Sequence, residues 1–425
     1  MKKILGLVLC FAVLVGTVSF AACGGGGGAE GNQIVAWDLA NGSADVAKKA
    51  AVENFNASSE IKITLEQFEN DQYKEKIQAD MANGEGPDLI YGWGQTGIMK
   101  RWVDAGEIAD LTGKVDTLLD KVVDSVAKGC VFDGKTYGVP IESTQPIIMY
   151  YNKKLFKKIN AEYPKTWEEF LALIPKFRDA NIVPVSVAGG AAWTEMMWAE
   201  YLVDNIAGPD AFLSILDNDA GAWTNPDIVK AMTELEKFIK LKPFEDGYES
   251  VTPDQNGELA LLCEDKAAMM LQGSWLTSTI ANDYADAKDN IELGQFPFYE
   301  GGKGDATNLV GNLSNYWSVS AKADQAVQDA AIKFLDDEIF TESYVDELLA
   351  VDSIPPVKGI ENKITNDKIK FLYEKINDAD SFQLSWDQSL DPDASNVLLN
   401  GLTELFTGKT SAKAWCEMMD GTIQQ

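Results

Sequence analysis

Segments with the patterns of strands and helices alternate near the N-terminal end of the chain, and this alternation limits the folds it can adopt. Apolar or alternating runs typical of strands occupy residues 33–37, 61–66 and 87–91. Apolar side chains at helical spacing follow them at residues 44–56, 73–81 and 96–105. Because strands joined through helices form right-handed crossovers, the sequence predicts an α/β fold with a largely parallel first sheet.

Beyond residue 130 the pattern becomes less regular. Residues 131–140 predict a hairpin with a turn at Asp133-Gly134, and strands are predicted at 147–151 and 182–187. We expect a long helical region from about residue 195 to residue 276, strands at 291–294 and 316–320, and mostly helix in about the last hundred residues. Since a chain of about 400 residues exceeds one compact core, two domains are expected.

The N-terminus carries the pattern of an export signal. Two lysines precede an apolar stretch over residues 4–20, and two alanines stand directly before Cys23. This pattern resembles a bacterial lipoprotein signal, although Phe20 stands where such signals usually have leucine. The resemblance implies a signal peptide over residues 1–22 and a lipid on Cys23, with residues 23–32 as a glycine-rich tether. An uncleaved signal anchor is the alternative interpretation.

The types of residue present narrow the chemistry. The chain has 66 Asp and Glu against 36 Lys and Arg, a net charge of −30, which repels nucleic acid and anionic lipid. It has no histidine, which excludes Ser-His-Asp and Cys-His catalysis. Cys130, Cys263 and Cys416 are far apart and odd in number, so we expect no disulfide framework. No cysteine spacing typical of a metal site is present, and neither a metal nor a cofactor is expected.

Six short motifs follow one another in an order that resembles a known family. They are a Gly-Pro-Asp strand at residues 86–91, a pair of segments at 134–140 and 149–153, a capped helix start at 165–170, a Gly-Ser-Trp motif at 266–275, Ile354-Pro355-Pro356, and a helix turn at 407–412. In this order they resemble the extracellular solute-binding proteins of carbohydrate ABC importers, the maltose-binding-protein-like group. The resemblance covers essentially the whole mature chain.

The resemblance implies a two-lobed periplasmic-binding-protein-like fold of type II, with a ligand cleft between lobes that are discontinuous in sequence. Lobe 1 is predicted over residues 33–142 and 308–352, and lobe 2 over residues 143–307 and 353–425. Ligands of open α/β sheets bind at the carboxyl ends of strands, and hinge closure would bring both lobes onto the ligand.

A sugar presents hydroxyl groups that need polar partners and C–H faces that pack on flat aromatic rings. Residues of both kinds fall at predicted strand ends, crossings and loops. The predicted ligand-binding residues are Trp37, Asp38, Asn70, Trp93, Gln95, Glu142, Trp193, Glu195, Trp275, Asn312, Asn315, Tyr316, Trp386 and Asp387. Trp275 is assigned by its family position, whereas aromatic residues at strand ends can also seal a core. Trp102, Trp167 and Trp415 have apolar neighbours at helical spacing and are predicted to be core residues.

Together these features predict a monomeric receptor on the extracellular face of the cell membrane, lipid-anchored through Cys23. It would bind a sugar or oligosaccharide, pass it to membrane permease subunits served by a cytoplasmic ATPase, and catalyse nothing. Two other classes of function stay open. A glycoside hydrolase would need two carboxyl groups facing each other across the cleft. A binding protein for a peptide, polyamine or phosphoester would need clustered charges, and the only arginines, Arg101 and Arg178, lie away from the strand ends.

Overall fold

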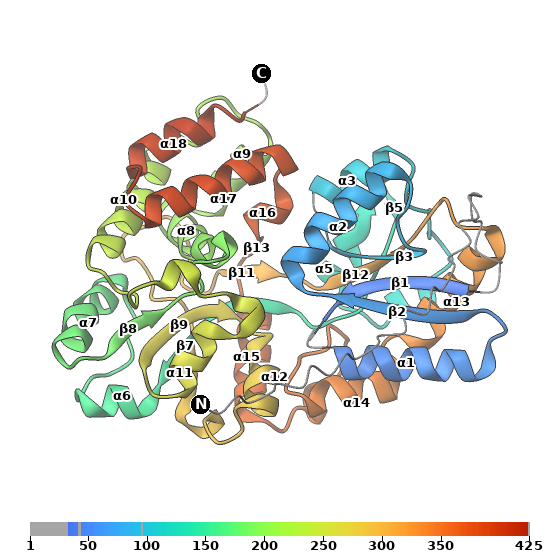
Figure 1. The fold of residues 1–425 in the computed structure, drawn as a ribbon, viewed down its shortest axis with the longest axis horizontal. Helices are drawn as coiled ribbons and strands as arrows, with labels where there is room; N and C mark the ends of the chain where they lie inside the picture. The colour runs from blue at the N-terminus through green and yellow to red at the C-terminus, as the bar shows by residue number, and fades with distance from the viewer. Residues whose placement is uncertain (1–32, 41–43, 95–96, 424–425) are drawn as a thin grey trace, which may run out of the picture.

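The computed structural model describes residues 33–40, 44–94 and 97–423, which form two α/β lobes lying side by side (Figure 1). Each lobe is built on its own β-sheet, and each sheet takes strands from separate parts of the sequence. The predicted signal peptide, Cys23, the tether and Gln95 lie outside the described residues. Within the described part of the chain, no helix combines the length and the apolar character needed to cross a membrane.

The first lobe, on the right in Figure 1, contains a five-stranded sheet. Its strands lie in the order β2 (Lys62–Phe68), β1 (Gln33–Leu39), β3 (Leu89–Trp93), β12 (Asn315–Val319) and β6 (Val139–Pro140). β1 is parallel to β2 and β3, as the alternation of strand and helix predicts. β12 is antiparallel to both of its neighbours, so the predicted parallel character holds for one half of the sheet.

Helices cover both faces of the first sheet, which explains why β3 is buried along its whole length (Figure 1). They are α1 (Asp45–Ser58), α2 (Asn70–Asn83), α3 (Gly97–Asp104), α4 (Asp116–Leu119), α5 (Asp124–Ala127), η1 (Lys128–Cys130), α13 (Gln325–Glu338) and α14 (Glu342–Ala350). The predicted hairpin is present as β4 (Val131–Phe132) and β5 (Lys135–Thr136). Asp133 and Gly134 at its turn have φ of 50° and 75°, the positive values that a tight hairpin turn requires.

The second lobe contains a six-stranded sheet. Its strands lie in the order β13 (Phe382–Leu384), β11 (Leu309–Asn312), β7 (Gln145–Asn152), β9 (Ala267–Gly273) and β8 (Val183–Ser186), with β10 (Ile291–Gly294) also paired to β7. β9 lies inside the region from 195 to 276 that the sequence predicts as helical, and that prediction is wrong at this point. Alanine, methionine and leucine favour helix, but pairing with β7 and β8 on both sides overrides the local preference.

Helices surround the second sheet as well (Figure 1). They are α6 (Lys153–Lys158), α7 (Trp167–Asp179), α8 (Ala192–Ala207), α9 (Pro209–Leu216), α10 (Pro226–Lys240), η2 (Tyr248–Ser250), η3 (Pro253–Gln255), α11 (Gly257–Cys263), α12 (Leu276–Asp283), η4 (Lys288–Asn290), η5 (Glu361–Lys363), α15 (Asp367–Asp378), α16 (Trp386–Ser389), α17 (Pro392–Phe406) and α18 (Ala412–Asp420). The predicted cap at Thr166 is confirmed, because its side chain and that of Glu169 form a reciprocal capping box at the start of α7.

The chain passes between the lobes at residues 141–144, which join β6 to β7, and at residues 313–314, which join β11 to β12. A third passage leads from α14 through α15 to β13. The predicted boundary at residue 308 puts β11 in the first lobe, whereas β11 pairs with β7 and β13 of the second sheet. Each of the first two crossings therefore connects a strand of one sheet to the next strand in the sequence, which belongs to the other sheet.

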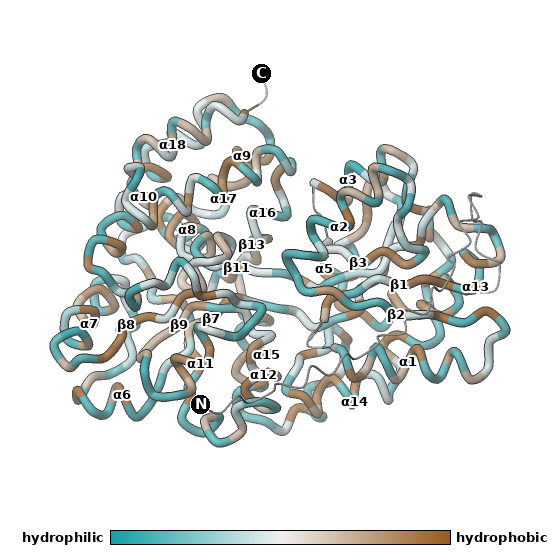
Figure 2. The backbone as a smooth tube through the Cα atoms, viewed as in Figure 1, coloured by the Kyte–Doolittle hydropathy of each residue, from teal (hydrophilic) through white to brown (hydrophobic). Residues whose placement is uncertain are grey.

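Apolar side chains gather in two cores: the first fills the first lobe and continues onto one face of the second sheet, and the second packs on the other face of that sheet. Figure 2 shows apolar stretches along the central strands and hydrophilic stretches along the outer loops. Trp102 belongs to the first core, and Trp167 and Trp415 belong to the second, as predicted. Leu276 and Ile369, from α12 and α15, also belong to the first core, so apolar packing continues across the crossings. The two lobes are therefore joined below the cleft by apolar packing as well as by the chain crossings.

Candidate functional site

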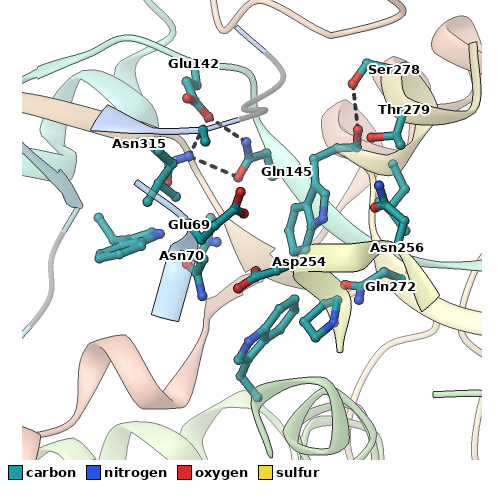
Figure 3. A pocket seen from close by; sticks show the side chains of 18 of the residues that line it. Glu69, Asn70, Glu142, Gln145, Asp254, Asn256, Gln272, Ser278, Thr279 and Asn315 are labelled. Carbon is teal, nitrogen blue, oxygen red and sulfur yellow. Dashed lines mark hydrogen bonds between the residues drawn. The ribbon is translucent and has the colours of Figure 1, made fainter. Parts of the chain in front are cut away.

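A cleft of about 450 Å³ lies between the lobes and is lined by both of them. On the first lobe it receives residues that follow β1, β2 and β3, because the carboxyl ends of parallel strands share one edge of a sheet. On the second lobe it receives residues from α8, η3, α11, β9, α12 and α16. Figure 3 shows Glu69 and Asn70 of the first lobe close to Asp254 of the second.

The floor of the cleft lies at the crossings and carries a fixed set of polar side chains. Gln145 Nε2 donates a hydrogen bond to Glu142 Oε2 over 3.1 Å, and Asn315 Nδ2 donates to the same oxygen over 2.6 Å (Figure 3). Asn312 lines the cleft beside them. Asn315 Oδ1 is buried and accepts no hydrogen bond from the described residues, which leaves an acceptor for a ligand hydroxyl.

Behind this floor, a buried lysine holds two carboxylates. Lys48 Nζ lies 2.6 Å from Asp38 Oδ2 and 2.7 Å from Glu142 Oε1, and all three side chains are almost completely buried. Burial lowers the pKa of Lys48, but Asp38 and Glu142 outweigh it and the net change is upward. Burial raises the pKa of Asp38 to about 6 against the opposing effect of Lys48, and Glu142 raises it further. Lys48 on α1 therefore ties the end of β1 to the first crossing.

Aromatic rings form the apolar part of the cleft. Trp193 and Trp275 of the second lobe have ring centroids 6.1 Å apart at an interplanar angle of 54°. A Cβ atom added at Gly273 would lie 1.9 Å from the Trp275 ring, so glycine at this position lets the ring pack against the backbone. Trp93 faces them from the first lobe, with Lys74 Nζ 5.3 Å from its ring centroid.

A polar wall of the second lobe completes the cleft. Its side chains are those of Asp254, Asn256, Glu258, Gln272, Ser278 and Thr279. Gln272 Nε2 donates to Glu258 Oε1 over 3.1 Å, and burial raises the pKa of Glu258. Burial also raises the pKa of Asp254, and Asp71 and Glu69 of the facing lobe raise it further, while Lys74 lowers it. The two lobes thus bring like charges towards each other at this edge.

An ion pair joins the lobes at the cleft, and a second, between Arg101 Nη2 and Asp391 Oδ2 at 3.0 Å, joins them beyond the cleft lining. Lys74 Nζ of α2 lies 3.2 Å from Asp387 Oδ2 of α16. Lys74 is the only basic side chain among the described residues that line the cleft, against Asp45, Glu69, Glu142, Asp254, Glu258, Asp283 and Asp387. The pair lies beside the Trp93 ring, so it stands between the aromatic and acidic parts of the site.

Many of the residues predicted from the sequence line this cleft. They are Asn70, Trp93, Glu142, Trp193, Trp275, Asn312, Asn315 and Asp387. Their spacing along the chain is wide, yet strand ends, crossings and the Gly-Ser-Trp motif bring them to one cavity. The predicted Gln95 lies outside the described residues.

Other predicted site residues point into the protein. Trp37 packs edge-on against Phe68 in the first core, and the Asp38 carboxylate forms a buried ion pair with Lys48. The Tyr316 hydroxyl donates to the Val126 carbonyl at 2.8 Å, which buries that ring in the first lobe. Successive side chains of a strand face opposite sides of the sheet, so Trp37 faces α2, with Lys76 Nζ over its ring, and Asp38 faces α1. Tyr316 likewise faces away from its neighbour Asn315, which lines the cleft.

Two predicted residues of the second lobe are also remote from the cleft. Trp386 is completely buried, and its ring packs on Phe212 and Trp223. Glu195 is buried on α8, and neither carboxylate oxygen has a partner among the described residues. Burial, with a smaller effect of Glu249, raises the pKa of Glu195 to about 8.

Sequence reasoning missed part of the second-lobe wall. Gln272 directly precedes the Gly-Ser-Trp motif, and Ser278 and Thr279 lie one helical turn after Trp275, so the motif itself could have indicated them. Asp254 and Asn256 lie in a short loop with no periodic pattern. Asn256 has a φ of 51°, a left-handed value that asparagine tolerates, and it places the start of α11 at the cleft.

The residues that the structure describes do not form a candidate metal site. No group of three or more His, Cys, Asp or Glu side chains among them could hold a metal ion. The carboxylates at the cleft are instead distributed along its length or hydrogen-bonded to neighbouring amides. The arrangement provides hydrogen-bond acceptors, amides and flat rings to a ligand held between two lobes.

Comparison with known proteins gives a consistent result. The profile of bacterial extracellular solute-binding proteins matches residues 40–336. The multiple sugar-binding protein of Streptococcus mutans serotype c is 26% identical over 336 residues, which span 73% of this chain and 76% of that protein. A structure from work on xylan utilization by Caldanaerobius polysaccharolyticus is 25% identical, with a TM-score of 0.82 over 92% of this chain and 100% of that one. A chitin oligosaccharide binding protein is 24% identical, with a TM-score of 0.83 over 92% and 97% of the two chains.

Proposed function

This chain belongs to the bacterial extracellular solute-binding proteins, and from that membership we propose that it binds a sugar or oligosaccharide between its lobes for an ABC importer. The observation that carries the proposal is a single cavity in which two tryptophans meet amide side chains from both lobes. Flat rings suit the C–H faces of a sugar, and amides suit its hydroxyl edges. The S. mutans relative is named a multiple sugar-binding protein, which supports the same ligand class.

Binding and closure are linked in this proposal. A ligand that contacts both lobes stabilises the closed arrangement, because only that arrangement offers both sets of contacts. Gln145 and Asn315 are already held by Glu142, so the floor changes little when a ligand arrives. The moving part is the second-lobe wall with Trp193 and Trp275. The closed form is then the one that membrane permease subunits, powered by a cytoplasmic ATPase, receive.

The remaining parts of the proposal concern the whole protein. It acts as a monomer, releases its ligand unchanged and catalyses nothing. It is anchored by a lipid on Cys23 to the extracellular face of the cell membrane, and residues 23–32 act as its tether. The composition of the N-terminal sequence supports this anchoring.

The proposal is tested by a thermal-shift screen of the purified full chain against mono- and oligosaccharides, amino acids, polyamines and glycerophosphodiesters. A ligand that binds only the folded state raises the melting temperature. We expect a shift with one set of sugars. Trp275→Ala is expected to weaken that binding about thirtyfold, since truncating a central tryptophan costs on the order of 2 kcal/mol. Trp275→Phe, which keeps a flat ring, is expected to retain most of the affinity.

A second ligand class has one observation in its favour, namely the excess of acids along the cleft. A polyamine or another cationic ligand would need such carboxylates. Several of them are already engaged, however, because Glu142 pairs with Lys48 and Asp387 pairs with Lys74. A shift with polyamines and none with any sugar would overturn the carbohydrate proposal and leave the binding fold intact.

A further inference from the structure

A second cavity of about 850 Å³ adjoins the ligand cleft on the side of α2, α3 and α17. The two cavities share part of their lining, which consists of Lys74, Trp93, Trp193, Asp387 and Gln388. We call this shared lining the neck. Both lobes contribute to it, because Lys74 and Trp93 come from the first lobe and the others come from the second. The second cavity is therefore continuous with the cleft and lies between the same two bodies.

The ion pair between Lys74 and Asp387 lies in the neck. Lys74 Nζ lies 3.2 Å from Asp387 Oδ2 and 5.3 Å from the centroid of the Trp93 ring. Lys74 keeps 26% of its side chain exposed, whereas Asp387 keeps 6%. The exposed part of the ion pair can form a hydrogen bond with a hydroxyl group of a sugar. The Trp93 ring beside it can pack on a C–H face of the same sugar.

The walls of the second cavity are two helix faces that oppose each other. On α2, Asp71, Lys74 and Gln78 are three and four residues apart and so lie on one face. On α17, Asn396 and Asn400 are four residues apart and both exposed. Each helix thus turns polar side chains, amides among them, toward the space between the lobes.

The same cavity also has an apolar surface. Ile98, Met99 and Trp102 of α3 line it from the first lobe, and Leu399 of α17 lines it from the second. Amides beside apolar side chains repeat the chemistry of the first cleft, which joins Asn and Gln side chains to Trp193 and Trp275.

We infer that the second cavity extends the ligand cleft and receives the outer units of a linear oligosaccharide whose inner units occupy the first cavity. The inference rests on the proposed function and specifies its substrate class as a chain longer than a disaccharide. Each cavity alone has the size of a site for a small molecule, about 300–1,000 Å³. Joined through the neck, they have room for a ligand of several units that touches both lobes on either side of the Lys74–Asp387 pair.

The test is isothermal titration calorimetry of the full chain with xylo-, chito- and malto-oligosaccharides of two to six units. For the series that binds, the affinity is expected to rise about tenfold or more from the dimer to the tetramer or pentamer, since each added hydrogen bond contributes a few-fold. The double variant Gln78→Ala, Asn396→Ala removes one amide from each wall. It is expected to reduce the affinity for the long sugars about fivefold or more, so that the advantage of length largely disappears.

Gln72→Ala is the matched control, because Gln72 is an exposed glutamine on α2 that lines neither cavity. It is expected to keep the wild-type dependence on length. An affinity that is the same for dimer and hexamer, or a double variant that behaves like Gln72→Ala, overturns the inference while leaving a sugar receptor in place. A wild-type chain that binds no sugar of any length overturns the proposed function, and the inference falls with it.

Discussion

The two lobes bury their carboxyl groups in opposite ways. In the first lobe, Asp38 lies against Lys48, which also binds Glu142 at the crossing. In the second lobe, Glu195, Glu200, Asp204, Glu245 and Glu258 are buried or partly buried, and none of them forms an ion pair with a described residue. Burial is the first cause that raises the pKa of each of these five acids.

This difference matters for how each lobe responds to its surroundings. In the first lobe, Lys48 opposes the effect of burial on Asp38, whose pKa is raised only to about 6. A buried acid without a base becomes neutral by taking up a proton, and the pKa of Glu195 is raised further, to about 8. The stability of both lobes therefore depends on pH, and the second lobe carries the larger part of this dependence.

The largest expected effect comes from removing the lysine that the first lobe depends on. Lys48→Met leaves two buried carboxylates without a cation, although Gln145 and Asn315 still donate to Glu142, and breaking a buried pair in this way costs about 3–5 kcal/mol of unfolding free energy. Urea denaturation followed by circular dichroism measures the loss. Lys49→Met on the same helix is the control, because Lys49 is exposed and its pair with Asp45 is worth below about 1 kcal/mol. Equal losses in the two variants would mean that the buried cluster does not hold the lobe together.

The next effect is a dependence of stability on pH that arises mainly in the second lobe. The folded pKa is about 8 for Glu195 and about 7 for Glu245, both above the ordinary value of 4.5. The folded state thus holds protons that the unfolded state has released, and stability falls as pH rises from about 4.5 through 8. Between pH 5.5 and 8.5 we expect the unfolding free energy to fall by on the order of 5 kcal/mol, of which Glu195 contributes about 3 kcal/mol.

The variant Glu195→Gln sharpens this prediction. An amide cannot ionise, so the variant should be more stable than the wild type at pH 8.5 and nearly equal to it at pH 5.5. Thermal melts at both pH values measure the difference. An unfolding free energy that does not change over this range would show that these acids are charged and solvated in the folded protein.

The smallest effect concerns Lys74 and Asp387, the ion pair that joins the lobes at the cleft. Lys74→Met removes the partner of Asp387 and should favour the open arrangement of the unliganded protein. Because Lys74 is still partly exposed, we take the pair to be worth about 1 kcal/mol, the upper end of the range for surface pairs, and expect the affinity for the sugar to fall about two- to fivefold. Small-angle X-ray scattering should detect a larger radius of gyration. Lys76→Met is the control, since Lys76 pairs with Asp80 inside α2, and an unchanged radius for Lys74→Met would contradict the prediction.

Sequence reasoning predicted best where structure follows from neighbouring residues. The strand–helix alternation gave β1, β2 and β3 in parallel, and their shared carboxyl edge explains why Asn70 and Trp93 reach the cleft. It did not reveal β9, because a run of Ala, Met and Leu favours a helix until strands on both sides pair with it. Pairing between distant segments is the information that a local pattern lacks.

The site was predicted less completely than the fold, for a reason that one pair of residues makes clear. Trp386 and Asp387 are adjacent in sequence, yet Trp386 lies in the second core and Asp387 lines the cleft. A sequence motif can place such a pair near a site, but consecutive residues of a helix such as α16 point about 100° apart, so at most one of them faces the cleft directly. Likewise, Asp254 and Asn256 lie in a loop whose position is set by α11 and the neighbouring helices.

The place of β12 in the first sheet has a consequence for the time at which this protein can fold. β12 lies between β3 and β6, but it is synthesised only after every strand of the second sheet except β13. Ribosomes add about 5–20 residues per second, so β3 waits on the order of ten seconds or more for its neighbour. Until then β6 has no strand to join, and the first lobe remains incomplete. A chain with this strand order completes the sheet of the lobe that it begins first only after most of the second sheet has been made.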